Sequence, residues 1–347
     1  LTNKISAQEI DAVRKLFDEC RNVVIVTHTS ADGDAIGSSL GLYEYLKKKG
    51  KNVTVIVPNF YPDFLKWMTD TDKIIQHNFH RKTARMYIDH ADLICVLDLN
   101  EVSRMEELGE VVRGAKAKKV MIDHHLNPER ECFDLVFSCI EVSSACELLF
   151  WVIMNLPDIG GDVQRLPMKC AEAIYVGMMT DTNNFSNSVV PSTFEMAARL
   201  IARGIDKDDL QERILHCYSI PRTRLMGHLV KDNLRIVGDY AAYMTLSNEE
   251  KDFYEFKPGD SEGFVNIPLS ISSVKVSALF TENFDGKYIR VSLRSKGEVD
   301  VNSFAKKYFN GGGHRNASGG RLYMPIGEVP AYFERSLAEW LDEIKFS

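Results

Sequence analysis

The chain has 347 residues, of which 45% are hydrophobic and 26% charged, and its formal net charge is −7. This length suits about two domains, and no apolar run approaches the roughly 20 residues that a membrane-spanning helix needs. Proteins that follow long nucleic acids usually carry a basic surface, so the acidic balance favours a small or short ligand.

The N-terminal stretch, residues 1–21, is charged and amphipathic and lacks the uninterrupted apolar core of a signal peptide. The seven cysteines are odd in number and include no C-x-x-C pair. That pattern suits free thiols in a reducing compartment better than a disulfide framework. We therefore expect a cytoplasmic protein that does not contact a membrane.

Apolar, β-branched runs alternate with helical patterns through the first half of the chain. Strands are expected at 22–27, 53–57, 93–97, 120–122 and 133–137, and helices at 36–49 and 101–113. Continuous apolar strands separated by helices are typical of a parallel sheet covered on both faces. The predicted fold class is therefore α/β, with a mainly parallel N-terminal sheet flanked by helices.

Acidic and histidine residues follow the ends of three of these strands. They are His28, Asp32 and Asp34 after the first strand, Asp98 after the strand at 93–97, and Asp123, His124 and His125 after that at 120–122. The carboxyl ends of parallel strands meet at one edge of a sheet, where ligands bind. Carboxylates and imidazoles gathered there are suitable ligands for two divalent cations, which clamp phosphate and activate water. The pattern predicts a metal-dependent hydrolase of phosphate esters.

Taken singly, these motifs also have ordinary structural explanations. An Asp-Gly-Asp unit is typical of a turn, and Asp98 alone would serve as a helix cap. Two adjacent histidines after an aspartate are rarely needed for packing, so one imidazole is expected to bind metal while the other faces the substrate. Asp123 can fix the tautomer of such a ring through a hydrogen bond, without binding the metal itself. The combination favours a metal site.

Asp181 follows a helix expected over residues 168–179, where its charge would face the negative end of the helix dipole. A bound cation would remove that penalty, and a solvated loop aspartate is an equally acceptable explanation. His77, His80 and His90 lie in a polar stretch without a carboxylate cluster. We assign these three to the solvated surface.

The second half of the chain changes character twice. Residues 191–224 are helical and charged, whereas strands are expected at 234–237, 241–246, 274–280, 288–293 and 321–324, with helices at 300–309 and 328–344. This pattern predicts a smaller α+β C-terminal domain. The expected organisation is a metal-binding domain at 1–190, a helical connector at 191–230 and a substrate-binding domain at 231–347.

The C-terminal domain carries a glycine-rich motif of its own. Gly312 and Gly313 belong to a run of three glycines before His314, and such a run lets backbone N–H groups approach an anion. A flexible turn is the alternative. Arg294 ends a predicted strand and could grip a phosphate through two hydrogen bonds. Arg104 and Arg315 are weaker candidates of the same kind, and a surface arginine is the alternative for each.

Together, HTSADGDAIGSS, VLDLN, IDHH, MTDTNNF, SLRS and GGGHRNASGG resemble the DHH phosphoesterase superfamily with the DHH-associated C-terminal domain. The resemblance covers nearly the whole chain and is strongest to the nanoRNase, or oligoribonuclease, and pAp-phosphatase branch. It argues against the DHH inorganic pyrophosphatases, whose second domain differs. The residues after the motif histidine, 316–318, depart from the small apolar run that is more usual in the family.

The resemblance implies a role for each motif residue. His28 and Asp32 would hold one Mn²⁺, Asp34, His124 and Asp181 would hold a second, Asp98 would bridge the two, and His125, backed by Asp123, would contact the scissile phosphate. Arg294, Gly312, Gly313 and His314 would hold the substrate, with Arg104 and Arg315 as further candidates. Mg²⁺ and Co²⁺ stay open as alternatives to Mn²⁺.

The activity implied is hydrolysis of short oligoribonucleotides to mononucleotides, and of 3′-phosphoadenosine 5′-phosphate (pAp) to AMP, by a water activated between two metals. The expected partner is a short single-stranded RNA or a nucleotide bisphosphate, and a homodimer stays open. Alternatives are a phosphodiesterase for linear or cyclic dinucleotides such as pApA, a single-strand exonuclease, and a nucleotide-binding sensor without catalysis.

Overall fold

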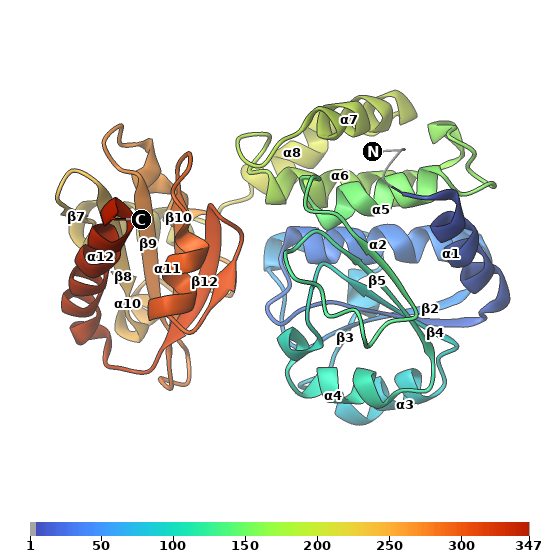
Figure 1. Cartoon of the computed structure of the whole chain (residues 1–347), viewed down its shortest axis with the longest axis horizontal. Helices are drawn as coiled ribbons and strands as arrows, with labels where there is room; N and C mark the ends of the chain where they lie inside the picture. The colour runs from blue at the N-terminus through green and yellow to red at the C-terminus, as the bar shows by residue number, and fades with distance from the viewer. Residues whose placement is uncertain (1–4, 347) are drawn as a thin grey trace. The chain divides into compact units, whose positions relative to one another are not determined.

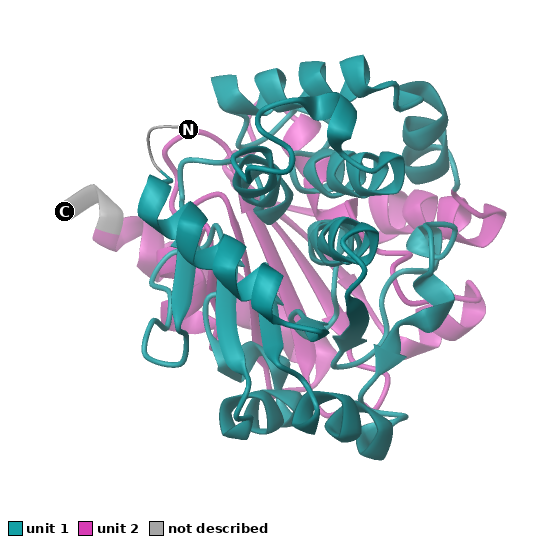
Figure 2. Ribbon diagram, turned by 90° about the vertical axis from the view of Figure 1, so that its right-hand side faces the viewer, with its two compact units in different colours: residues 1–217 teal, residues 218–347 magenta. Residues whose placement is uncertain are grey.

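The computed structural model describes residues 5–346, and the chain divides into two compact units between Cys217 and Tyr218 (Figure 2). Residues 1–4 and 347, at the outer ends of the predicted domains, lie outside the described residues. The predicted connector spans the division, because α7 (Pro191–Arg203) and α8 (Lys207–Leu215) belong to unit 1 and α9 (Ile220–His228) belongs to unit 2. The domain limits drawn from the sequence stay predictions.

Unit 1 is built on a six-stranded parallel sheet, which confirms the predicted parallel sheet and adds a short strand at 75–76 that was not expected. Its strands are β1 (Asn22–Val26), β2 (Asn52–Val57), β3 (Ile75–Gln76), β4 (Leu93–Leu97), β5 (Lys118–Asp123) and β6 (Leu135–Ser138). Their order is β3-β2-β1-β4-β5-β6, and every neighbouring pair is parallel. The order reverses between β1 and β4, so the loops that follow these two strands leave in opposite directions, and in open α/β sheets ligands bind at this point.

Helices cover both faces of this sheet (Figure 1). One face carries α1 (Ala7–Glu19), α2 (Gly33–Lys48), α5 (Ala145–Met154) and α6 (Met168–Asp181), and the other carries α3 (Arg81–Asp89) and α4 (Glu107–Gly114). Each face has its own apolar core, and the core under α2, α5 and α6 is much the larger. Among the described residues, no helix is both long enough and apolar enough to cross a bilayer.

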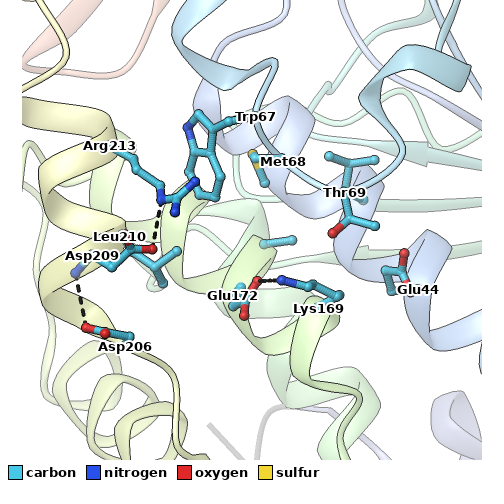
Figure 3. Close-up of a pocket in the computed structure, with 12 residues that line it drawn as sticks. Glu44, Trp67, Met68, Thr69, Lys169, Glu172, Asp206, Asp209, Leu210 and Arg213 are labelled. Carbon is cyan, nitrogen blue, oxygen red and sulfur yellow. Dashed lines mark hydrogen bonds and ion pairs between the residues drawn. The ribbon is translucent and has the colours of Figure 1, made fainter.

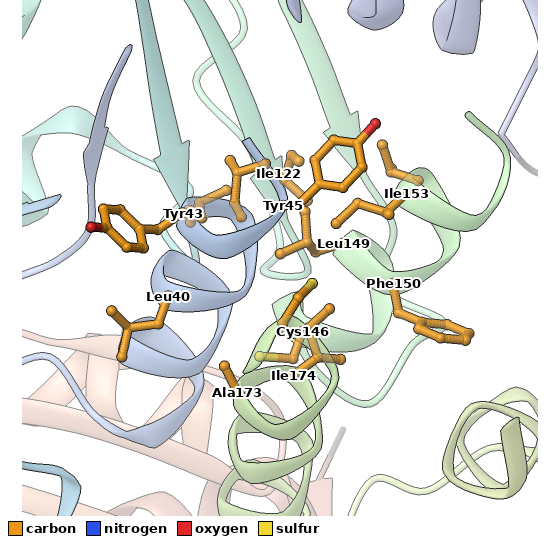
Figure 4. Close-up of a cluster of buried hydrophobic side chains, with 14 of the residues drawn as sticks. Leu40, Tyr43, Tyr45, Ile122, Cys146, Leu149, Phe150, Ile153, Ala173 and Ile174 are labelled. Atoms are coloured by element: carbon orange, nitrogen blue, oxygen red, sulfur yellow. The ribbon is translucent and has the colours of Figure 1, made fainter. Parts of the chain in front are cut away.

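The closest helix pair in unit 1 is α2 against α6, and glycines make it possible. Gly33, Gly37 and Gly41 recur at every fourth position, so they form one stripe along α2. A Cβ added at Gly37 would lie 2.7 Å from the carbonyl oxygen of Ala173 and 2.8 Å from Cα of Gly177. Figure 4 shows Ala173 and Ile174 of α6 beside α2, with Cys146 of α5 next to them. The backbones therefore touch where larger side chains would hold them apart.

Unit 2 is the smaller mixed α+β unit that the sequence predicted. Its strands are β7 (Arg235–Val237), β8 (Ala241–Leu246), β9 (Val276–Glu282), β10 (Ile289–Ser295), β11 (Gly312–Gly313) and β12 (Ala317–Leu322). The order is β11-β12-β10-β9-β8-β7, with β8 and β9 parallel and the other pairs antiparallel. The helices α11 (Val301–Tyr308) and α12 (Val329–Phe346) bury one face, α9 packs on the other, and α10 (Asn248–Phe253) follows β8.

The structure differs from the sequence-based expectations in three places. The helix expected at 101–113 is broken at Glu106, whose φ of 53° ends a 3-10 turn before α4 begins. The polar stretch after β3 contains α3, and His77 is buried, so its assignment to the solvated surface is wrong. Burial lowers the pKa of His77. The last strand begins at Ala317 rather than 321, because glycines let it pair with β11.

The glycine stripe on α2 can be tested with Gly37→Ala. The added methyl group would overlap the backbone of α6, so we expect a loss of about 1–3 kcal/mol in the free energy of unfolding. Gly114→Ala, at the end of α4, is the control, because a Cβ there meets nothing within 4 Å. Urea unfolding monitored by circular dichroism measures both variants, and equal stability of the two would contradict the packing described.

Candidate metal centre

The sequence-predicted site residues of unit 1 gather at the carboxyl ends of β1, β4 and β5. His28 lies two residues beyond β1, Asp98 directly follows β4, and Asp123 is the last residue of β5. Parallel pairing brings these strand ends to one edge, although they are far apart in the sequence. The α2 helix begins at the same edge, and α6 ends there at Asp181.

Asp98 is the centre of the cluster. Its side chain is 3% exposed, and its Oδ2 lies 3.4 Å from Nε2 of His28 while its Oδ1 lies 3.4 Å from Nε2 of His124. Oδ1 is buried and accepts no hydrogen bond from any residue that the structure describes. The backbone at Asp98 has a φ of 57°, a conformation that aspartate tolerates better than most residues. This geometry turns the carboxylate between the two imidazoles.

Asp32 and Asp34 flank the first turn of α2 but are held in different ways. Asp32 is the N-cap, and its Oδ1 accepts hydrogen bonds from the N–H groups of Asp34 and Ala35, both at 3.1 Å. Asp34 is buried, and its two oxygens accept from the N–H groups of Ala145 (2.6 Å) and Cys146 (2.9 Å). The free N–H groups at the start of α5 therefore fix the Asp34 carboxylate.

His124 joins the two helices to the centre. Its Nε2 lies 3.7 Å from Oδ2 of Asp181 and 3.8 Å from Oδ2 of Asp34. His125 points differently, because its Nδ1 is 2.7 Å from Oδ1 of Asp123 and its backbone N–H donates to Oδ2 of that residue. The two imidazole rings meet edge to face at 4.7 Å. Asp123 thus orients His125, while His124 faces the carboxylates.

Burial and neighbouring charges shift the pKa of His124, Asp34 and Asp98. Burial opposes a charge on His124, but the carboxylates of Asp98, Asp181 and Asp34 raise its pKa to about 10. Burial, together with Asp98 and Asp181, raises the pKa of Asp34 well above its usual range. Burial works against ionisation of Asp98, yet His124 and His28 hold its pKa well below the usual range. Negative charge therefore concentrates on the central aspartate.

The donor set fits divalent cations. One set of ligand atoms within 4.8 Å of one another comes from His28, Asp32 and Asp98, and another comes from Asp34, Asp98 and His124. Both sets include Asp98, whose buried Oδ1 has no hydrogen-bond donor among the described residues, and a cation held there would satisfy this oxygen. Mixed oxygen and imidazole ligands suit Mn²⁺ and similar metals.

Arg104 also lies near this cluster. Its carbonyl oxygen accepts a hydrogen bond from the N–H of Thr29 at 2.9 Å, and its charge is one of the influences that oppose protonation of His28. It is partly buried in the 3-10 turn before α4. A cation placed there would attract an anionic ligand to the same edge of the sheet.

The predicted substrate residues of unit 2 lie on and beside its sheet. Arg294 is on β10, Gly312 and Gly313 form β11, and the carbonyl oxygen of His314 accepts a hydrogen bond from Oγ of Ser318. Gly313 has a φ of 146° and donates its N–H to Oδ1 of Asn302, so at this position the glycine serves the fold.

Arg315 is the weaker candidate in unit 2, because its guanidinium already contacts a neighbouring residue. It donates to the carbonyl oxygen of Glu298 and forms an ion pair with the Glu298 carboxylate. The side chain is half exposed, and this contact occupies it with a structural partner.

A separate cavity of about 130 Å³ lies between α2, α6, α8 and the loop around Trp67 (Figure 3). Its charged groups are largely paired with each other, since Lys169 contacts Glu172 and Arg213 contacts Asp209, both at 2.7 Å. None of the predicted site residues lines it. We therefore place the chemistry at the carboxylate and histidine cluster.

The sequence patterns do not indicate how Asp34 is held. Ser144 is the N-cap of α5. The N–H groups of Ala145 and Cys146 that follow it bind Asp34, which lies 111 residues before Ala145. The available signal was Ser144-x-x-Glu147, a capping-box spacing that marks a helix start and its unpaired N–H groups.

Comparison with known families matches both units. The model of the DHH family, N-terminal domain, matches residues 22–178, and the model of the DHHA1 domain matches residues 239–344. The chain belongs to the DHH family. It is a DHH-family phosphoesterase with a DHHA1 domain, and the resemblance inferred from the motifs is confirmed.

Proteins with a solved structure or an assigned name are similar to this chain over most of its length. The crystal structure of an exopolyphosphatase-related protein from Bacteroides fragilis is 41% identical, with a TM-score of 0.91, over 99% of this chain and 100% of its own. A probable bifunctional oligoribonuclease and PAP phosphatase NrnA from Streptococcus mutans is 28% identical over 87% of this chain and 89% of its own. The cyclic-di-AMP phosphodiesterase PdeA of Listeria monocytogenes is 26% identical over 87% of this chain but only 45% of its own length.

If the cluster binds cations, Mn²⁺ should raise the thermal midpoint of the protein. A ligand at 100 times its dissociation constant stabilises the folded state by about 2.7 kcal/mol. Asp98→Asn should remove most of the Mn²⁺-dependent increase, whereas Asp158→Asn, at a carboxylate that accepts from Tyr45, should keep it. Differential scanning fluorimetry with and without chelator gives the comparison. An increase of the same size in Asp98→Asn would exclude Asp98 from the metal centre.

Proposed function

We propose that the protein hydrolyses short oligoribonucleotides to mononucleotides and pAp to AMP with two divalent cations, preferably Mn²⁺. The observation that carries the proposal is the buried Asp98 carboxylate between two imidazoles, with an oxygen that accepts no hydrogen bond from residues 5–346. The substrate assignment is supported by the name of the Streptococcus mutans relative, an oligoribonuclease and PAP phosphatase.

Each residue of the cluster receives a role in this proposal. His28 and Asp32 would hold one cation, His124, Asp34 and Asp181 would hold the other, and Asp98 would contact both. The bound cations would supply Lewis-acid charge for the phosphate and activate water for attack. Asp34 needs a fixed orientation for this, which the start of α5 provides.

His125 is proposed to contact the scissile phosphate. Asp123 occupies its Nδ1, so the contact would be made through Nε2. Burial lowers the pKa of His125, and the neighbouring Asp123 opposes that effect by stabilising the charged ring. The pair thereby keeps the imidazole in one orientation, able to donate to a phosphate oxygen when protonated.

Unit 2 is proposed to bind the substrate through Arg294 and the segment around Gly312, Gly313 and His314. An arginine suits a phosphate because its guanidinium donates two parallel hydrogen bonds. Arg104 in unit 1 is proposed to add positive charge near the reacting phosphate. Arg315 has the least support, because Glu298 already engages its guanidinium.

A phosphodiesterase for linear or cyclic dinucleotides is the second candidate. It is favoured by the Listeria monocytogenes relative, a cyclic-di-AMP phosphodiesterase. An assay of pAp, a short RNA, pApA and cyclic di-AMP, each with Mn²⁺ and then with chelator, separates the two. Polyphosphate belongs in the same assay because of the exopolyphosphatase-related structure. The proposal expects pAp and the short RNA to react fastest, and failure of both would overturn it.

Asp98→Ala should abolish Mn²⁺-dependent hydrolysis of pAp, because both cations would lose a shared ligand. Phosphate release measured at saturating Mn²⁺ checks this expectation. Near-normal turnover in the variant would reject the bridging role.

His125→Asn should lower kcat by about 10²–10⁴-fold, the usual contribution of a positioned proton donor, while Mn²⁺ binding is retained. His90→Asn is the control, since His90 is exposed at the end of α3 and should leave the rate unchanged. Steady-state kinetics on pAp distinguish the two. An equal rate for His125→Asn would remove this residue from the mechanism.

A further inference from the structure

We infer that Glu147 is a positioning residue for the metal centre, acting through the start of α5 on Asp34. The inference rests on the proposed function in one respect, because it takes Asp34 as a metal ligand. Glu147 is fully buried in the first turn of α5. None of the metal-site roles proposed above involves it.

The first step is the dependence of Asp34 on the backbone of α5. Both Asp34 oxygens are fixed by the consecutive N–H groups of Ala145 and Cys146, at 2.6 and 2.9 Å. These two bonds come from the backbone, so the direction of the Asp34 carboxylate follows the path of the backbone at 143–146. A shift of this turn would move a ligand rather than merely loosen the helix.

The second step is what fixes that turn. The Oε2 atom of Glu147 accepts hydrogen bonds from the backbone N–H of Ser143 at 2.9 Å and from its hydroxyl at 2.6 Å. The N–H of Glu147 in turn donates to Oγ of Ser144 at 3.0 Å. Glu147 therefore holds the turn through Ser143 and Ser144.

The third step anchors Glu147 itself to another helix. The hydroxyl of Ser192 donates to Oε1 at 2.6 Å, and that of Thr193 donates to Oε2 at 2.7 Å, both from the first turn of α7. The Oγ1 atom of Thr193 also accepts from the N–H of Val190 at 3.2 Å, which leaves its single proton for Glu147. The chain of contacts runs from α7 through Glu147 and the 143–146 turn to Asp34.

The chemistry of this network favours a carboxylate. Four donors converge on two oxygens, and a glutamine would replace one acceptor with an NH₂ group that faces a hydroxyl proton. A buried acceptor that served only the stability of α5 would leave metal affinity unchanged once the protein is folded. A positioning role predicts weaker metal binding at the ion that Asp34 holds, with the other ion unaffected.

The test is Glu147→Gln, titrated with Mn²⁺ alone by isothermal calorimetry. The wild-type chain should bind two ions. The variant should bind one ion with unchanged affinity and the other at least about 10-fold more weakly, which is the usual effect of removing a residue that orients a metal ligand. The kcat for pAp should fall while the KM stays near the wild-type value. Ser192→Ala, which removes one donor on the α7 side, should shift the same ion in the same direction.

Tyr45→Phe is the matched control, because it removes a buried hydrogen bond to Asp158 at the far end of α2. It should lower the thermal midpoint without changing Mn²⁺ binding. If Glu147→Gln does not fold, Ser192→Ala carries the test. Unchanged binding of both ions in the folded variants overturns the inference and leaves the proposed function intact. Absence of Mn²⁺ binding to the wild-type chain overturns the proposed function itself.

Discussion

The close contact between α2 and α6 determines where three of the proposed metal ligands lie. α2 starts at Asp32 and Asp34, and α6 ends at Asp181, so the two helices deliver carboxylates to one edge only if they run antiparallel at short range. The stripe of glycines on α2 allows this, because backbone meets backbone at Gly37 and Gly177. Helix packing in the interior of unit 1 thereby determines how closely the carboxylates of the cluster approach one another.

Strands and helices on several sides of the cluster hold these charged groups in place. The strand ends contribute His28, Asp98 and Asp123, the helix ends contribute the remaining carboxylates, and the start of α5 supplies backbone donors to Asp34. Oxygens crowded in this way repel one another, and folding tolerates the cost because apolar packing on both faces of the sheet fixes the backbone that carries them. A cation of high charge is the natural counterpart of such an arrangement.

Much of this organisation could be predicted from the sequence. The strands of unit 1 are short apolar runs with little ambiguity, and once they are parallel, His28, Asp98 and the triplet at 123–125 must share an edge. The fold class and the family follow from local patterns of this kind. The sequence predicts that the last strand begins at 321, whereas β12 begins at Ala317. The first residues of β12 are small and glycine-rich, and such a run resembles a turn when the strand that pairs with it is unknown.

Other features depend on contacts that a linear pattern does not display. The burial of His77 follows from β3 and α3, two short elements in a polar stretch, and the break at Glu106 is a backbone conformation that its residue type does not favour. The hold on Asp34 joins residues more than 100 positions apart. Such long-range hydrogen bonds become visible only when the elements are placed in space.

The two apolar cores of unit 1 are unequal, and this has a consequence for local unfolding. Segments with fewer buried apolar contacts open at lower free energy than the rest of a domain. The thinner layer, formed by α3 and α4, is connected to the loop that carries Asp98, whereas Asp34 and Asp181 belong to helices over the thicker core. Amide hydrogens in α3 and α4 should therefore exchange with solvent before those of α2 and α6.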